Sequence, residues 1–308
     1  MLRCELMEFD FSADEIIAGR KTFFIVPDPT LLPETYLEDY MTRGYETYII
    51  NDDRHCPLEK KVESIISIFK DSILFFFIDA QIPGIDWVYY IKNLQQRFNG
   101  ELLIGVLYMK RETEGEKLRL EKTYLFDIGI QCGCIAMEHE RAKNFALIAK
   151  VMYANQAQGR RKNIRAICDK SSKVNFDFDG SVYMGRLVDI SLSHFSCVMP
   201  SELAIPIYEK IENIFIDVNG FHFKSDGILL MERMVDGKAM YVFIFARHSD
   251  GGQGLDRDLR QRLAEKIYQM ITDKVKMIMQ LVFSEMGRGI SADERMSVFN
   301  PRDLRRLL

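Results

Sequence analysis

The chain has 308 residues, of which 47% are hydrophobic and 28% are charged, which is enough for two domains that each bury a core. Its 41 basic and 45 acidic residues give a formal net charge of −4, which argues against broad electrostatic binding to a nucleic-acid polymer. No apolar run approaches a membrane span and the first residues lack a signal-peptide core, so we expect a cytoplasmic protein whose six cysteines are reduced thiols.

After an N-terminal extension over 1–20, apolar runs alternate with amphipathic segments as far as residue 155. The runs that predict strands are 22–26, 47–50, 73–78, 102–108 and a weaker one at 132–136. Helices are predicted between and after them at 33–43, 57–70, 86–98, 114–126 and 139–157. Continuous apolar strands separated by helices indicate a parallel sheet covered on both faces. We therefore predict a doubly wound α/β domain of flavodoxin type over 21–155.

The third predicted strand ends at Asp79, in a segment that resembles the phosphoacceptor loop of response-regulator receiver domains. The resemblance implies that Asp79 is the acceptor, assisted by Mg²⁺, a hydroxyl residue and a lysine. Only Asp28 remains of the acidic pair that would hold the metal, Tyr108 or a neighbour occupies the hydroxyl position, and Ala136 or Met137 replaces the lysine. We interpret the domain as a pseudo-receiver that provides an interaction surface, with phosphorelay through Asp79 as a weaker hypothesis.

The second half reads as short strands followed by one long helix. Apolar alternation predicts strands at 174–178, 182–190, 214–218, 228–234 and 240–245. The pairs Asp179-Gly180, Asn219-Gly220 and Asp236-Gly237 are signals for two-residue hairpin turns. Apolar residues from Leu255 to Ile278 recur at three- and four-residue intervals. We predict an antiparallel β-barrel with a long amphipathic helix over 156–282 and a tail over 283–308.

Two basic and polar segments border the first strands of this barrel. Arg160, Arg161 and Arg165 lie on the segment that joins the two domains, and a guanidinium forks onto phosphate or onto the O6/N7 edge of guanine. Asp189 and Ser191 alternate at the end of a predicted strand and so would project together toward a guanine edge. Either half alone also fits a simpler interpretation, in which the arginines are a solvated boundary and Asp189 and Ser191 cap their own strand.

Together these segments resemble the PilZ domain, a six-stranded barrel that binds cyclic di-GMP through R-x-x-x-R and D/N-x-S-x-x-G motifs. The resemblance covers about 158–282 and implies ligand contacts by Arg161, Arg165, Asp189 and Ser191, with added charge from Arg160. The final glycine of the second motif is replaced by His194, whose ring occupies a place where the family has bare backbone. Histidine tolerates left-handed backbone angles better than most residues, so the turn is expected to survive the replacement.

The resulting prediction is a bacterial, non-enzymatic cyclic di-GMP effector without a cofactor, which changes its interdomain arrangement on ligand capture and acts through an unknown protein partner. The alternative is a scaffold in which both domains have lost their ligands, the barrel by gaining His194. Cys132, Cys134 and His139 could indicate a metal, but two cysteines on one face of a core strand explain the pattern better, and no metal is expected.

Overall fold

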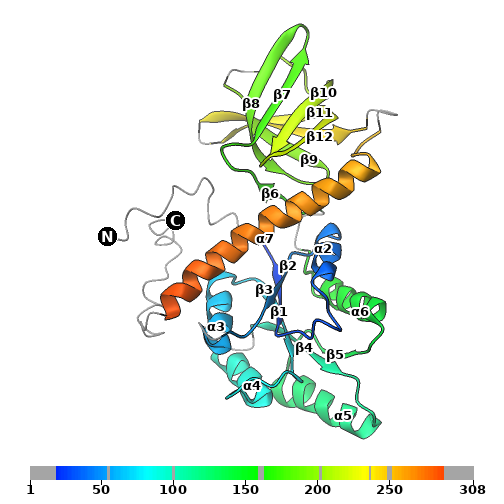
Figure 1. Ribbon diagram of the computed structural model, residues 1–308, viewed down its shortest axis with the longest axis vertical. Coiled ribbons are helices and arrows are strands. Elements are labelled where there is room, and N and C mark those ends of the chain that lie inside the picture. Colours follow the sequence, from blue (N-terminus) through cyan, green and yellow to red (C-terminus); the bar gives the residue numbers. More distant parts are fainter. Residues whose placement is uncertain are drawn as a thin grey trace. The chain divides into compact units, whose positions relative to one another are not determined.

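The computed structural model describes residues 19–53, 56–98, 101–158, 163–200, 203–235, 237–247 and 252–287. These residues fall into two compact units (Figure 1). One contains 19–158 together with 276–287, and the other contains 163–275. The domain limits inferred from the sequence remain predictions.

The first unit is built on a parallel five-stranded sheet in the order β2-β1-β3-β4-β5. Its strands are β1 (Lys21–Ile25), β2 (Thr47–Ile50), β3 (Ser72–Phe77), β4 (Leu103–Met109) and β5 (Cys134–Met137). All the residues of β1 and β3 are buried, as the continuous apolar runs predict for strands covered on both faces. The strand order is that of a doubly wound fold, and the direction in which successive strands are added to the sheet reverses between β1 and β3.

Helices cover both faces of this sheet. They are α2 (Thr35–Thr42), α3 (Leu58–Ile68), α4 (Trp87–Arg97), α5 (Glu114–Lys122), its continuation as the π-helix η1 (Thr123–Ile128), and α6 (Arg141–Ala154). In Figure 1, α2 and α6 lie on one side of the sheet and α3 and α4 on the other. Tyr40 of α2 stacks on Phe145 of α6 with ring centroids 4.4 Å apart, and Phe76 of β3 contacts Trp87 of α4 at 5.9 Å. Aromatic packing therefore fixes both helical layers.

In the second unit, the described strands form a closed antiparallel barrel. They are β6 (Ala166–Ile167), β7 (Lys173–Phe178), β8 (Ser181–Ile190), β9 (His194–Val198), β10 (Lys210–Val218), β11 (Phe221–Val235) and β12 (Lys238–Ala246). Six of them follow the order β8-β7-β10-β11-β12-β9, and pairing of β9 with β8 closes the ring. The short β6 adds to the other edge of β8. Closure removes the exposed edges that an open sheet would leave.

Two of the three predicted turn pairs adopt the backbone that a type I′ hairpin requires. Asp179 and Gly180 have φ of 50° and 75°, and Asn219 and Gly220 have φ of 48° and 80°. Asp236 lies outside the described residues, although its neighbour Gly237 has a φ of 75°. The barrel interior is filled by apolar residues that are fully buried, including Leu187, Phe195, Ile214, Ile216 and Phe243.

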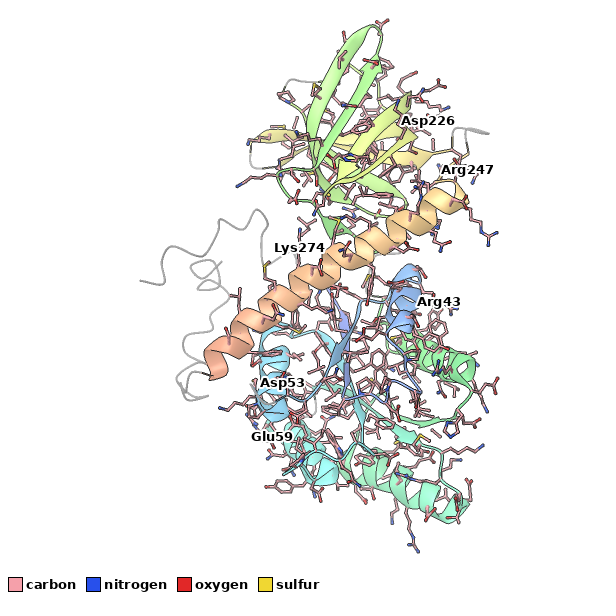
Figure 2. All side chains as sticks on the ribbon, in the orientation of Figure 1. Arg43, Asp53, Glu59, Asp226, Arg247 and Lys274 are labelled. Carbon is pink, nitrogen blue, oxygen red and sulfur yellow. The ribbon has the colours of Figure 1, made fainter. Side chains whose placement is uncertain are left out.

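The long helix α7 (Arg257–Gly287) follows the barrel, and its residues are shared between the two units at 275/276. On the barrel side, Leu263, Ile267 and Val275 are buried, as the three- and four-residue spacing predicts. Lys274 donates to the carbonyl of Ile167 in β6, and Figure 2 labels this lysine on the helix. None of the described helices is both long enough and apolar enough to cross a membrane.

Candidate functional site

The pairing of β6 with β8 brings two of the predicted site residues together. Ile167 pairs with Asp189 in this ladder, and Arg165 lies two residues before Ile167. The guanidinium Nη1 of Arg165 is 3.7 Å from Oδ1 of Asp189, and both side chains remain partly exposed, at 34% and 16%. The result is a loose ion pair at the surface of the barrel, with a donor fork and a carboxylate that can both reach an incoming ligand.

The turn between β8 and β9 is organised around the hydroxyl of Ser191. Its Oγ accepts from the backbone N–H of His194 at 3.1 Å and donates to the carbonyl of the same residue at 3.1 Å. The backbone N–H of Ser191 also donates to that carbonyl, at 2.8 Å. Ser191 is 2% exposed, so its hydroxyl holds the turn in the ligand-free chain. A contact between Ser191 and guanine stays a prediction.

His194 begins strand β9, and its backbone is not left-handed. The left-handed conformation that a glycine at this position would permit is therefore not needed here. The turn survives because Ser191 satisfies the backbone of His194. The ring Nδ1 lies 2.7 Å from Oγ of Ser193. Burial lowers the pKa of the His194 ring, the nearby Arg165 lowers it further, and Asp189 opposes this shift. The neutral ring is therefore favoured in the folded protein.

Two residues that the sequence did not single out hold this turn from outside. Asn163 donates from Nδ2 to Oγ of Ser193 at 2.8 Å, and Arg260 of α7 reaches the carbonyl of Leu192 at 3.5 Å. Asn163 is one of the spacer positions of the R-x-x-x-R segment, so its place there was the only available signal. Arg260 lies 68 residues from its contact, and nothing local in the sequence indicates it.

Arg160 and Arg161, the other basic residues predicted for the site, lie outside the described residues. The predicted residues that the structure does place close together are therefore Arg165, Asp189, Ser191 and His194. Together they present one cation, one carboxylate, a buried hydroxyl and a neutral imidazole at the junction of β6, β8 and β9.

Asp79, the candidate phosphoacceptor, is already paired in the α/β unit. One carboxylate oxygen accepts from the backbone N–H of Met109 at 2.6 Å, and the other forms an ion pair with Arg111. Asp28 is bound locally, because Thr30 donates to it from both its backbone N–H and its hydroxyl. The hydroxyl of Tyr108 donates to Glu121 at 3.1 Å.

The described residues contain no group of three acidic, histidine or cysteine side chains that could hold a metal ion. Cys134 begins β5 and Cys132 lies two residues before it, and burial raises the pKa of each thiol to about 12. Protonated thiols are poor metal ligands, so packing is the simpler role for both.

No protein-family model matches the chain, and neither does any curated protein. Solved structures that resemble part of it include a PilZ domain. The PilZ domain of YcgR from Escherichia coli with c-di-GMP is 17% identical over 39% of this chain and 97% of its own, with a TM-score of 0.32. MrkH of K. pneumonia in its apo state is 12% identical, covering 38% of this chain and 54% of its own, with a TM-score of 0.32. PlzA of Borreliella burgdorferi in complex with c-di-GMP is 16% identical, covering 42% of this chain and 48% of its own, with a TM-score of 0.25.

The chain thus spans about half of the longer solved proteins that it resembles, namely 54% of MrkH and 48% of PlzA. Among these three, the matches cover at most 42% of this chain.

Proposed function

We propose that the chain is a non-enzymatic signalling effector whose barrel binds cyclic di-GMP. The observation that carries the proposal is the β6–β8 ladder, which sets Arg165 beside Asp189 next to the turn that Ser191 holds. A carboxylate accepts hydrogen bonds and a guanidinium donates them, so the pair is complementary to the donor and acceptor edges of guanine and to phosphate. The loose ion pair holds both groups ready without burying either one.

Each residue has a role that follows from its chemistry. Asp189 accepts from the N–H groups of a guanine, and Arg165 donates to phosphate or to the guanine O6/N7 edge. Arg161 adds a second donor fork and Arg160 adds positive charge. Ser191 keeps the turn in shape with its hydroxyl close to the guanine edge, and His194 contributes a ring contact where the PilZ motif has a glycine.

The signal leaves the protein as a change in the arrangement of the two units. Arg160 and Arg161 stand on the segment between the last described residue of the α/β unit, Gln158, and the first of the barrel, Asn163. A ligand held by these arginines and by the barrel favours one interdomain arrangement over others. The α/β unit, which resembles a receiver domain, then acts as the surface for a protein partner. The pairing of Asp79 with Arg111 supports a binding role over phosphotransfer.

Titration calorimetry with cyclic di-GMP tests the site. Wild-type protein is expected to bind, and Arg165→Ala and Asp189→Asn are each expected to weaken binding at least about tenfold, because each removes a charged hydrogen-bond partner. Arg233→Ala is the matched control, since Arg233 is exposed on β11 and contacts Met240 instead of the site.

Equal affinity in the wild type, Arg165→Ala and Asp189→Asn would place the ligand elsewhere. If the wild type does not bind cyclic di-GMP but His194→Gly does, the histidine has disabled the site and the chain is a scaffold.

A further inference from the structure

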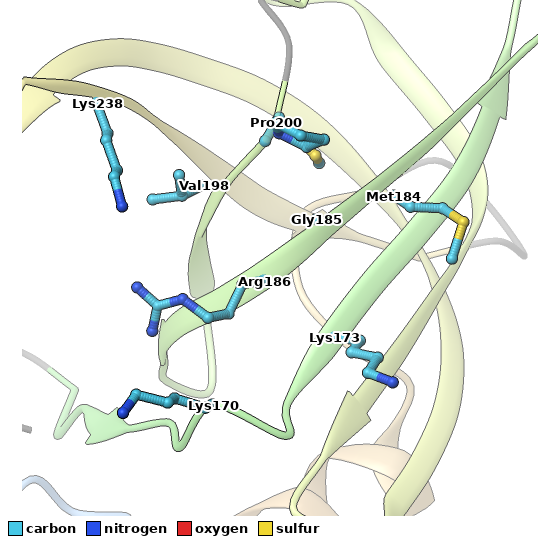
Figure 3. A pocket seen from close by; sticks show the side chains of 9 residues that line it. Lys170, Lys173, Met184, Gly185, Arg186, Val198, Pro200 and Lys238 are labelled. Carbon is cyan, nitrogen blue, oxygen red and sulfur yellow. The ribbon is translucent and has the colours of Figure 1, made fainter. Parts of the chain in front are cut away.

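A second feature of the barrel surface is a hollow of about 500 Å³ on the outside of β7, β8, β9 and β12. Nine residues line it, four of them basic and none acidic: Lys170, Lys173, Met184, Gly185, Arg186, Val198, Met199, Pro200 and Lys238. In Figure 3, the charged ends of Lys170, Arg186 and Lys238 lie on the left side of the view. A volume of this size is typical of small-molecule sites and too small for a folded partner.

Strand register explains why the basic residues meet. Arg186 of β8 pairs with Lys173 of β7 on one side and with Val198 of β9 on the other. Val198 in turn pairs with Met240 of β12, two residues beyond Lys238. Paired residues on neighbouring strands lie roughly 5 Å apart and share a face, so Lys173 and Arg186 stand side by side, and Lys238 lies at the start of the strand next to β9.

The four cations differ in how they are partnered, and Lys170 already interacts with another part of the protein. Within the described parts of the chain, no carboxylate forms an ion pair with Arg186 or Lys238. Lys173 stands opposite Asp217 of β10 in the strand register, as well as opposite Arg186 of β8. Clustered like charges repel one another, and an anion that bridges them relieves the repulsion.

The hollow also has an apolar floor. Gly185 lets β8 approach β9 closely, because a Cβ at this position would lie 2.4 Å from Sδ of Met199 and 2.8 Å from the carbonyl of Val198. Met199 is buried to 7% exposure beneath it, while Met184 is 60% exposed at the edge. Thioether and aliphatic groups offer a surface for an apolar or aromatic ring beside the cations.

The hollow is separate from the Arg165–Asp189 pair. Arg186 and Asp189 are three residues apart on β8, which is roughly 10 Å along a strand. The hollow opens over the ladders with β7 and β9, whereas Asp189 pairs with Ile167 of β6 and Ser196 of β9. None of the residues that line the hollow belongs to the turn held by Ser191.

We propose that this hollow binds a second ligand, a small organic anion that carries two or more phosphate groups and a ring. The phosphates bridge Arg186 and Lys238, with Lys170 and Lys173 at the margins, and the ring rests on Met199 and Pro200. The proposal does not depend on cyclic di-GMP binding at the other site.

ADP, AMP and inorganic pyrophosphate serve as probes in calorimetry with the full chain at low salt. ADP is expected to bind more tightly than AMP, which has one phosphate fewer, and than pyrophosphate, which lacks the ring. The double variant Arg186→Ala/Lys238→Ala is expected to weaken ADP binding at least about tenfold, because two charged donors are lost. Added salt weakens the binding, as it does for exposed charges.

Two controls define the outcome. Lys224→Ala removes an exposed lysine of β11 that does not line the hollow, and Arg165→Ala alters only the other site; both are expected to bind ADP like the wild type. Thermal unfolding of each variant checks that the barrel is folded.

The proposal is overturned if neither ADP nor pyrophosphate gives a heat of binding at millimolar concentration. It is also overturned if Arg165→Ala abolishes ADP binding while the Arg186→Ala/Lys238→Ala variant retains it, since the phosphates would then occupy the site beside Asp189. Failure of the proposed function has a different signature, because a wild type that ignores cyclic di-GMP leaves the ADP measurements unaffected.

Discussion

At the scale of single residues, the sequence points to charged and hydroxyl side chains as candidate ligand contacts, but not to the residues that hold the turn in place. Arg165, Asp189 and Ser191 could be singled out because charge and spacing are visible in the chain. Asn163 and Arg260 could not, because their roles arise from proximity to Ser193 and Leu192 in the folded barrel. The hydroxyl of Ser191 also has a structural duty toward the His194 backbone that no spacing rule reveals.

His194 gives the protein a predictable response to acid. Burial and Arg165 lower its pKa in the fold, whereas in the unfolded chain the ring titrates near pH 6.5. Just below this pH the unfolded state binds more protons than the folded state, so the free energy of unfolding falls as pH drops from about 6.5 toward the folded pKa.

Urea unfolding at several values between about pH 7.5 and pH 5.5 measures this contribution. His194→Gln, which keeps a neutral polar side chain, is expected to lose part of the decline in stability with falling pH. Identical pH dependence in the wild type and His194→Gln would contradict the assignment.

At the scale of secondary-structure elements, periodicity predicts the long strands and helices and misses what pairing alone creates. The predicted strands correspond to β1–β5, β7, β8 and β10–β12, with ends shifted by at most four residues, except that β11 begins seven residues earlier than predicted. β6 has only two residues and is defined by its pairing with β8, so the sequence shows no apolar alternation that would predict it. β9 is not among the predicted strands, because its first residue, His194, also belongs to the motif that predicts a turn. The π-helical end of α5 was indistinguishable from ordinary helix.

The pairing of β8 with β9 leaves no room for a side chain at position 185. A methyl group there meets Met199 and the backbone of Val198, so Gly185→Ala is expected to destabilise the barrel by about 1–3 kcal/mol. Gly115→Ala is the control, because this glycine lies in α5 with open space around its Cα, and alanine in a helix is expected to be neutral or stabilising by about 0.5–1 kcal/mol. Denaturant unfolding followed by circular dichroism measures both, and a Gly185→Ala protein as stable as the wild type would show that the strands can move apart freely.

At the scale of the whole molecule, the sequence predicts two kinds of fold, and the structure confirms a parallel α/β sheet and a closed antiparallel barrel. The change of hydrophobic pattern near residue 155 predicts a boundary between them, and its position stays a prediction. The sharing of α7 between the two units was not predictable, because an amphipathic stripe does not say which surface it covers. Its apolar residues show only that the helix is buried along one face.

The proposed signal output is a change in the arrangement of the two units. Small-angle X-ray scattering of the full chain is expected to differ with and without saturating cyclic di-GMP, because the ligand joins the barrel to the segment that carries Arg160 and Arg161. Arg165→Ala, which is expected to leave the barrel folded but weaken capture, provides the matched control. Superimposable curves for the wild type at saturation would remove the switch while leaving ligand binding intact.

The most direct test of the account is a titration of wild-type protein with cyclic di-GMP beside cyclic di-AMP. The two ligands share their phosphates and differ in the base edge, which is the part that Asp189 is proposed to read. We expect micromolar or tighter binding of cyclic di-GMP and at least about tenfold weaker binding of cyclic di-AMP, since a misplaced donor or acceptor at a charged partner is costly. Equal affinity for both ligands, or no binding of either, would contradict the claim that this barrel recognises guanine.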